Sequence, residues 1–274
     1  MVDRTSLSTR VASIPLWYHT IDLPDGSATP GWFDLRPVVD RLPWPEVKGK
    51  RCLDIGTFDG FLAFEMERRG AAEVICTDVP SHKDWDHLPR ERARTLAFWG
   101  AAGGEKGAGF RVAADILGSS VTREWISIYD LSPERLGTFD VVVCGNVLIH
   151  LRAPFLALEA IRSVCGDHFL STEAIDRPFT VLARMRPALF LEGIEGRWMI
   201  PNAAAHGRMI DLAGFDVLRA TTYGEHFGVG HPERGRRGIR NRLRRLGNRL
   251  VAGDADVVPH SAVLSRIAHL DVTE

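Results

Sequence analysis

The sequence contains no uninterrupted apolar stretch near the roughly 20 residues that a membrane-spanning helix needs. Its first residues, MVDRTSLSTR, also lack the apolar core of a secretion signal. These two absences predict a chain that makes no membrane contact and stays in the cytoplasm.

Cysteine is scarce, and no two cysteines show the C-x-x-C spacing that is typical of metal and redox sites. Three of the four lie inside apolar segments, where a small apolar side chain suits the position. We therefore expect reduced, mostly structural thiols and no metal site. The cysteines are Cys52, Cys76, Cys144 and Cys165.

The chain has no strong excess of either charge, because its formal net charge is −1 over 274 residues. A composition of 45% hydrophobic and 25% charged residues is that of an ordinary globular protein. The length suits one α/β domain with elaborations better than two domains.

The charge is unevenly distributed, since residues 230–250 carry eight arginines and a single acid, Glu233. Phosphates pair with arginines, so this window could contact RNA. It lacks the interleaved aromatic residues that stack on bases, and its spacing also fits the faces of a solvated helix. We favour the solvated helix. The arginines are Arg234, Arg236, Arg237, Arg240, Arg242, Arg244, Arg245 and Arg249.

No internal repeat is visible, and apolar strands alternate with amphipathic helices. Strands with near-continuous apolar residues are buried on both faces, which is typical of a parallel sheet covered by helices. The predicted fold class is therefore α/β, with a doubly wound, mostly parallel, Rossmann-like sheet and helices on both faces. The predicted strands are 51–55, 73–79, 124–131, 139–148 and 168–173, and helices are predicted from residues 61, 110 and 154.

The remaining segments predict how the domain is organised. Residues 1–45 form an aromatic-rich lead-in, and residues 46–274 form the main domain. A helix over 202–213, a strand from Phe215 and an apolar stretch from Ser261 come last. The Arg-rich segment, about 228–252, is then an insertion between the final two strands.

The turn after the first predicted strand reads D-x-G-x-x-x-G, from Asp54 to Gly60. Gly56 would let a ligand approach the backbone closely, and Gly60 would permit tight entry into the helix. A dinucleotide site needs G-x-G-x-x-G to hold pyrophosphate, but here the first position is acidic. A carboxylate at Asp54 repels phosphate and suits an ammonium group.

The next strand ends in Asp78, where an acid can accept both hydroxyls of a ribose. An ammonium group and a ribose together indicate S-adenosylmethionine, and we expect Thr57 and Val79 to lie beside it. The alternative is that both glycines only form a tight turn and both acids cap helices.

Ligands of doubly wound sheets lie outside the carboxyl ends of the strands. Tyr129 and Asp130, at the end of the third predicted strand, are therefore expected near the adenine. Gly145 and Asn146, in the fourth, are expected near the reactive methyl group. Each of the four could instead be a turn residue.

Beyond the glycine turn, several segments resemble class I S-adenosylmethionine-dependent methyltransferases, and among them the tRNA wobble-uridine (5-carboxymethoxyuridine-forming) methyltransferase-like family. The resemblance covers about residues 18–223. It implies the methyltransferase fold and a cofactor of the S-adenosylmethionine type, carboxylated in that family. The segments are FDVVVCGNVLIHLRAP, Ser171-Thr172-Glu173, GRWMIPNAAAHGRMIDLAGF and TIDLPDGSATPGWFDLRPVV.

The sequence departs from this family at one position. The family has tyrosine before the histidine in V-L-Y-H, where it helps to hold the extra carboxylate of the cofactor; here the residue is Ile149. Because isoleucine cannot hydrogen-bond a carboxylate, we expect plain S-adenosylmethionine and a small-molecule acceptor, plausibly a specialised metabolite. A tRNA-modifying enzyme and a non-catalytic binding protein remain the alternatives.

His150 and Glu173 follow the fourth and fifth strands and could remove a proton from a hydroxyl acceptor. The alternative for His150 is a histidine bonded to backbone. Aromatic residues of the lead-in, and Trp198, could form a lid over cofactor and acceptor or simply staple the segment to the core. The candidates for acceptor contact are Trp17, Tyr18, His19, Trp32 and Trp198, with His206, His226 and His231 unranked.

Overall fold

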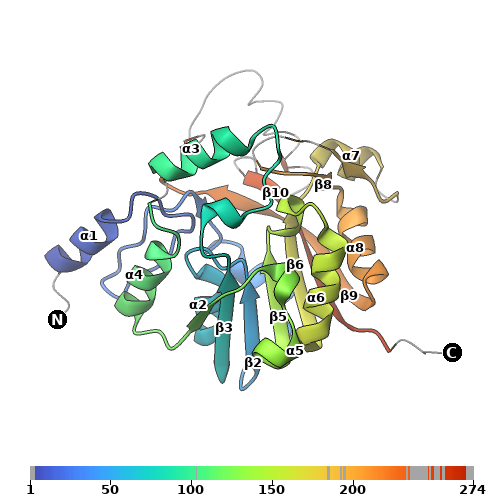
Figure 1. Ribbon diagram of the computed structural model, residues 1–274, viewed down its shortest axis with the longest axis horizontal. Helices are drawn as coiled ribbons and strands as arrows, with labels where there is room; N and C mark the ends of the chain where they lie inside the picture. The colour runs from blue at the N-terminus through green and yellow to red at the C-terminus, as the bar shows by residue number, and fades with distance from the viewer. Residues whose placement is uncertain are drawn as a thin grey trace.

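The computed structural model describes residues 4–102, 104–183, 186–191, 193, 196–232, 234, 246, 248, 249, 254 and 257–269. One eight-stranded sheet forms the centre of this part of the chain. Figure 1 shows helices α1 (Arg4–Ala12) and α4 (Ala108–Leu117) on one side, and α6 (Pro154–Val164) and α8 (Ala203–Leu212) on the other.

Five parallel strands form one half of the sheet, and antiparallel strands extend it. In the sheet, the final described strand (Val257–Ile267) lies between the fifth parallel strand (Cys165–Ala174) and the strand Phe215–Phe227. This topology confirms the predicted doubly wound, mostly parallel fold class. In spatial order the strands are β1 (Phe33–Asp34), β9 (Phe215–Phe227), β10 (Val257–Ile267), β6 (Cys165–Ala174), β5 (Phe139–Gly145), β2 (Arg51–Ile55), β3 (Glu73–Asp78) and β4 (Thr122–Trp125).

Shorter elements complete the described chain. The helices are α2 (Phe61–Arg68), α3 (Arg92–Ala102), α5 (Pro133–Leu136) and α7 (Arg177–Leu182). A two-stranded sheet pairs β7 (Leu189–Phe190) with β8 (Ile200–Pro201). The 3-10 helices are η1 (Val39–Arg41), η2 (His82–Asp84), η3 (Ile128–Asp130) and η4 (Leu148–His150).

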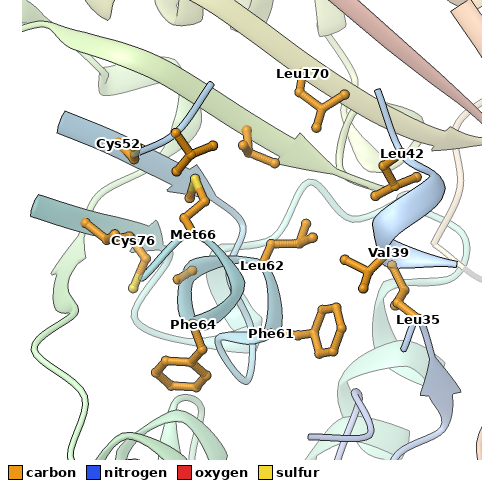
Figure 2. Close-up of a cluster of buried hydrophobic side chains, with 14 of the residues drawn as sticks. Leu35, Val39, Leu42, Cys52, Phe61, Leu62, Phe64, Met66, Cys76 and Leu170 are labelled. Carbon is orange, nitrogen blue, oxygen red and sulfur yellow. The ribbon is translucent and has the colours of Figure 1, made fainter. Parts of the chain in front are cut away.

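Successive residues of the central strands are buried on opposite faces of the sheet, because side chains alternate along a strand with a period of two residues. Cys52 packs with α2 and α4 on one face, while Leu53 packs with α6 and α8 on the other. Figure 2 shows the first cluster, where Leu62 and Met66 of α2 lie between the strands and the lead-in. Burial on both faces explains why these strands read as continuous apolar runs. All four cysteines are buried free thiols.

Two predicted strands extend too far. The third ends at Trp125, not at residue 131, because the Ser127 side chain accepts the N–H of Tyr129 and starts η3. The fourth ends at Gly145, since Asn146 has φ +55° and cannot continue a strand. Tyr129 and Asp130 therefore do not end a strand, which corrects the basis of the adenine prediction.

The lead-in joins the sheet through β1, whose Phe33 pairs with Phe227 of β9. The ring of Trp17 is only 2% exposed and lies in the core. The Arg-rich segment lies between β9 and β10 in the chain. Six of its arginines fall outside the described residues, which include only Arg234 and Arg249. Within the described ranges, no helix is long and apolar enough to cross a bilayer.

Candidate functional site

The glycine turn follows β2 at the carboxyl end of the parallel strands. Gly56 has φ +74°, and a Cβ there would lie 2.5 Å from Cγ2 of Val147. Gly60 has φ +95°, and a Cβ there would meet the rings of Phe64 and Phe110 within 2.7 Å. Both positions therefore need glycine for conformation and for space.

Asp54 lies under this turn and is 1% exposed. Its Oδ2 accepts no hydrogen bond from the described residues. Burial, with the nearby carboxylate of Asp78, raises the pKa of Asp54 to about 7, although hydrogen bonds from the Thr57 side chain and the Ala63 backbone to the carboxylate oppose the rise. A buried oxygen without a donor is costly, and an ammonium group would satisfy it. Asp54 therefore fits the amino group of a methionine moiety.

Asp78 is the last residue of β3, but it is already engaged. Its Oδ2 accepts hydrogen bonds from Lys106 Nζ at 2.7 Å and Arg123 Nη2 at 3.1 Å. The same oxygen accepts the N–H of Phe58 at 3.3 Å, and Oδ1 accepts the N–H of Val79 at 2.8 Å. Oδ1 keeps one acceptor position for a ribose hydroxyl, so the fit to a ribose is partial.

Asp59, inside the glycine turn, holds the lead-in over the site. Its Oδ2 accepts the backbone N–H groups of Tyr18 and, at 3.1 Å, of His19. The Tyr18 ring then packs 5.0 Å from the ring of Phe58, and the His19 ring stacks 5.7 Å from that of Phe61. Asp59 was not among the residues predicted from the sequence, although its place in the motif was a usable signal.

The lead-in also reaches the tip of β5. A hydrogen bond joins the side chains of Tyr18 and Asn146. Oδ1 of Asn146 accepts the N–H of Ala174 at 3.2 Å, which fixes the amide. Gly145 leaves room for Leu62, whose Cδ1 would lie 2.8 Å from a Cβ. The structure thus brings Tyr18, His19, Gly145 and Asn146 together beside the glycine turn.

Glu173 has a positioning role in this structure. Its carboxylate accepts the backbone N–H groups of Val147, Leu148 and Ile149 and so caps the start of η4. Burial raises its pKa to about 8. These three hydrogen bonds occupy the Glu173 carboxylate. Of the two candidate proton acceptors, Glu173 and His150, the geometry therefore favours His150.

His150 bonds the carbonyl oxygen of Gly196 through Nδ1, at 3.0 Å. Since a carbonyl only accepts, Nδ1 carries the hydrogen and the neutral ring keeps Nε2 as an acceptor. Burial lowers the pKa of His150, which favours this neutral ring. The alternative expected for His150, a hydrogen bond to the backbone, is therefore present, and it leaves Nε2 able to take a proton.

The next predicted residues are Tyr129, Asp130 and Trp198. Tyr129 donates its hydroxyl hydrogen to Asp86, and Asp130 is exposed. The backbone oxygen of Asp86 accepts the indole N–H of Trp198 at 2.8 Å. Asp86 therefore connects η3 to the segment that carries Trp198.

Trp17 and Trp32 differ in their surroundings. Trp17 is a core residue and bonds the carbonyl of Val11, which favours the staple interpretation for this ring. Trp32 lies 6.0 Å from the rings of Trp99 and His231.

Two of the unranked histidines have local partners. Nε2 of His206 bonds the Ser171 hydroxyl in the core at 2.9 Å. His226 faces Asp254 at 3.8 Å.

A buried acid and histidine on β9 and β10 were missed by the sequence analysis. Oε2 of Glu225 lies 3.2 Å from Nε2 of His260, and both side chains are at most 6% exposed. Nδ1 of His260 bonds the carbonyl of Val258. Burial raises the pKa of Glu225 to about 8. Phe33 pairs with Phe227 of β9, and the ring centroids of Phe33 and Tyr18 lie 5.0 Å apart. Glu225 is two residues from Phe227 on the same strand, so the Glu225–His260 pair lies on the side of the sheet that the lead-in covers.

Comparison with solved structures identifies the fold. The N-terminal domain of EvdMO1 with S-adenosylhomocysteine bound has a TM-score of 0.53 and 14% identity, covering 97% of this chain and 98% of that chain. The [4+2]-cyclase SpnF has a TM-score of 0.53 and 17% identity, covering 96% and 93%. The chain has the Rossmann-like fold of class I S-adenosylmethionine-dependent methyltransferases.

Sequence comparison gives a weaker relationship. No protein-family model matches the chain. A tRNA U34 carboxymethyltransferase from Campylobacter hominis is 28% identical over 137 residues, which are 49% of this chain. The match covers 40% of that relative's length. The resemblance noted in the sequence is therefore supported over about half of the chain.

Proposed function

We propose that this chain is an S-adenosylmethionine-dependent methyltransferase that methylates an oxygen or nitrogen of a small molecule, plausibly a specialised metabolite, in the cytoplasm. The observation that carries the proposal is the unpartnered Oδ2 of buried Asp54 beside the Gly56 turn. In this fold, an ammonium group is the partner that this oxygen needs.

The chain's residues would bind, align and shield the reactants. When bound, S-adenosylmethionine supplies a methyl group that an acceptor displaces from the sulfonium, so alignment and exclusion of water matter most. Asp54 would hold the amino group, and Asp78 Oδ1 a ribose hydroxyl. The lead-in over residues 1–45, docked by Asp59, would act as the lid.

Two groups could take a proton from a hydroxyl acceptor. His150 offers Nε2, because Nδ1 is committed to Gly196. Glu225, which lies beside His260, is the second. The side chain of Asn146, at the tip of β5, hydrogen-bonds that of Tyr18.

The burial of these groups favours a small acceptor. Glu225 and His260 are almost fully enclosed, and burial together with the charge of Glu225 raises the pKa of Tyr18 in the lead-in. Such an enclosed set suits a compact ligand with hydrogen-bonding groups better than a polymer. A structure of EvdMO1 with this fold was obtained in the presence of S-adenosylhomocysteine and D-fucose, at a TM-score of 0.52.

The test of the proposal is titration calorimetry with S-adenosylmethionine and S-adenosylhomocysteine. We expect both to bind at one site per chain. Absence of binding by either would favour a non-catalytic protein on the same scaffold. Binding and reaction should be measured separately, because the [4+2]-cyclase SpnF has a similar fold and a fold does not fix the reaction.

A tRNA-modifying activity is the second candidate, and the Campylobacter hominis relative favours it. Binding of labelled bulk tRNA at about 50 and about 200 mM salt separates the candidates, because phosphate contacts lose affinity steeply with salt. Tight, salt-sensitive binding would support the tRNA function. No binding at the lower salt concentration would remove it.

A further inference from the structure

Lys106 lies where the proposed function requires the cofactor's ribose, and the inference below rests on that proposed function. Its side chain is 3% exposed, and Nζ is 2.7 Å from Oδ2 of Asp78. The ammonium group also lies over the rings of Phe58 and Trp85, at 4.9 and 5.2 Å from their centroids. Lys106 is therefore held by a buried carboxylate and two aromatic rings.

This arrangement limits what Asp78 can accept. Oδ2 receives hydrogen bonds from Lys106, Arg123 and the Phe58 backbone, and a carboxylate oxygen has about two good acceptor positions. Oδ1 can take one more donor. Lys106 is the closest of the three donors to Oδ2, at 2.7 Å against 3.1 and 3.3 Å, so a second ribose hydroxyl would have to take the place of Lys106 on that oxygen.

Arg123 is fixed more firmly than Lys106. Its guanidinium bonds the carbonyl oxygen of Phe58 at 2.9 Å and lies 4.3 Å from the ring centroid of Trp125. It also lies 5.1 Å from the ring centroid of Phe110. Arg123 would therefore keep Asp78 paired if Lys106 left, and the buried carboxylate would not lose its only cation.

Lys106 has a short route to water. It lies two residues before α4, next to the N-cap Gly107, and the neighbouring residues Gly104 and Glu105 are exposed. A lysine side chain is flexible over four carbons and is strongly hydrated once outside the protein. Burial already lowers the pKa of Lys106, which means that its present position costs solvation.

We propose that Lys106 is a gate in the cofactor site: it occupies the ribose-binding side of Asp78 and must withdraw before a nucleoside binds. The apparent cofactor affinity is then the intrinsic affinity multiplied by the fraction of molecules in which Lys106 is withdrawn. Lys106 thus sets the affinity of the site through Asp78.

The test compares S-adenosylhomocysteine binding by calorimetry in the full chain, in Lys106→Met and in Arg111→Met. Arg111 is the matched control, because it is an exposed cation nearby on α4 that pairs with Glu105. We expect Lys106→Met to bind about tenfold more tightly than the wild type, corresponding to about 1.4 kcal/mol. Arg111→Met should bind like the wild type.

The other outcomes overturn the gate in distinguishable ways. Weaker binding by Lys106→Met would make Lys106 a direct ligand contact, and unchanged binding would leave it no role in affinity. If neither the wild type nor Lys106→Met binds, the proposed function fails instead. Binding only by the variant would support both. Thermal unfolding checks that the variant folds, and Lys106→Gln replaces it if it does not.

Discussion

The pKa of Asp54 makes cofactor binding depend on pH. Burial raises this pKa to about 7, whereas an exposed aspartate has a value near 3.9. An ammonium group pairs with the ionised carboxylate only. Binding must therefore draw a proton from Asp54 at pH values below 7, and the apparent affinity falls as the pH falls.

The size of the effect follows from the titration. At pH 8 most of Asp54 is ionised, at pH 7 about half, and at pH 6 about one tenth. The dissociation constant for S-adenosylhomocysteine should therefore rise about tenfold from pH 8 to pH 6, or about 1.4 kcal/mol. The same shift destabilises the ligand-free fold as the pH rises towards 7, because the native state holds a proton that the unfolded state has released.

Calorimetry across pH 6 to 8 in two buffers of different ionisation enthalpy measures both the affinity and the proton released. Asp54→Asn should weaken binding by about 1.5–3 kcal/mol, the value of a hydrogen bond to a charged group, and should flatten the pH dependence. The reasoning is refuted if the wild type shows no pH dependence, or if Asp54→Asn keeps the same slope. The variant is needed because burial also raises the pKa of Asp59 to about 7, so that the wild type alone does not tell the titration of Asp54 from that of Asp59.

Two further predictions concern the turn and the lead-in. Gly56→Ala should destabilise the fold by about 2 kcal/mol in chemical denaturation, since left-handed strain adds to a clash with Val147. Gly118→Ala is its control, because φ is +62° but the space is open; equal losses would contradict the clash. Asp59→Ala should speed hydrogen exchange at the Tyr18 and His19 amides at least about tenfold, as each loses its acceptor. Unchanged exchange would show that Asp59 does not dock the lead-in.

The parts of the fold that sequence predicts well are those with local causes. The β2 strand, the glycine turn and α2 follow one another within about 20 residues, and each has its own pattern. Pro154 begins α6 at its first position, as expected from its fixed φ.

The errors have physical causes that no local pattern reveals. The third strand stops at Trp125 because Ser127 caps a short helix, although apolar residues continue to Leu131. Lys106 lies 28 residues from Asp78 in a stretch rich in glycine and alanine, so its contact depends on the tertiary fold. Glu225 and His260 meet only when β9 and β10 pair.

A crystal structure with S-adenosylhomocysteine would test the central claim most directly. The account predicts the ligand's amino group at about 3 Å from Oδ2 of Asp54, and its ribose at Asp78 with Lys106 moved away. A ligand bound elsewhere, or soaked crystals in which Lys106 still covers Asp78 and no nucleoside lies over the Gly56 turn, would contradict it.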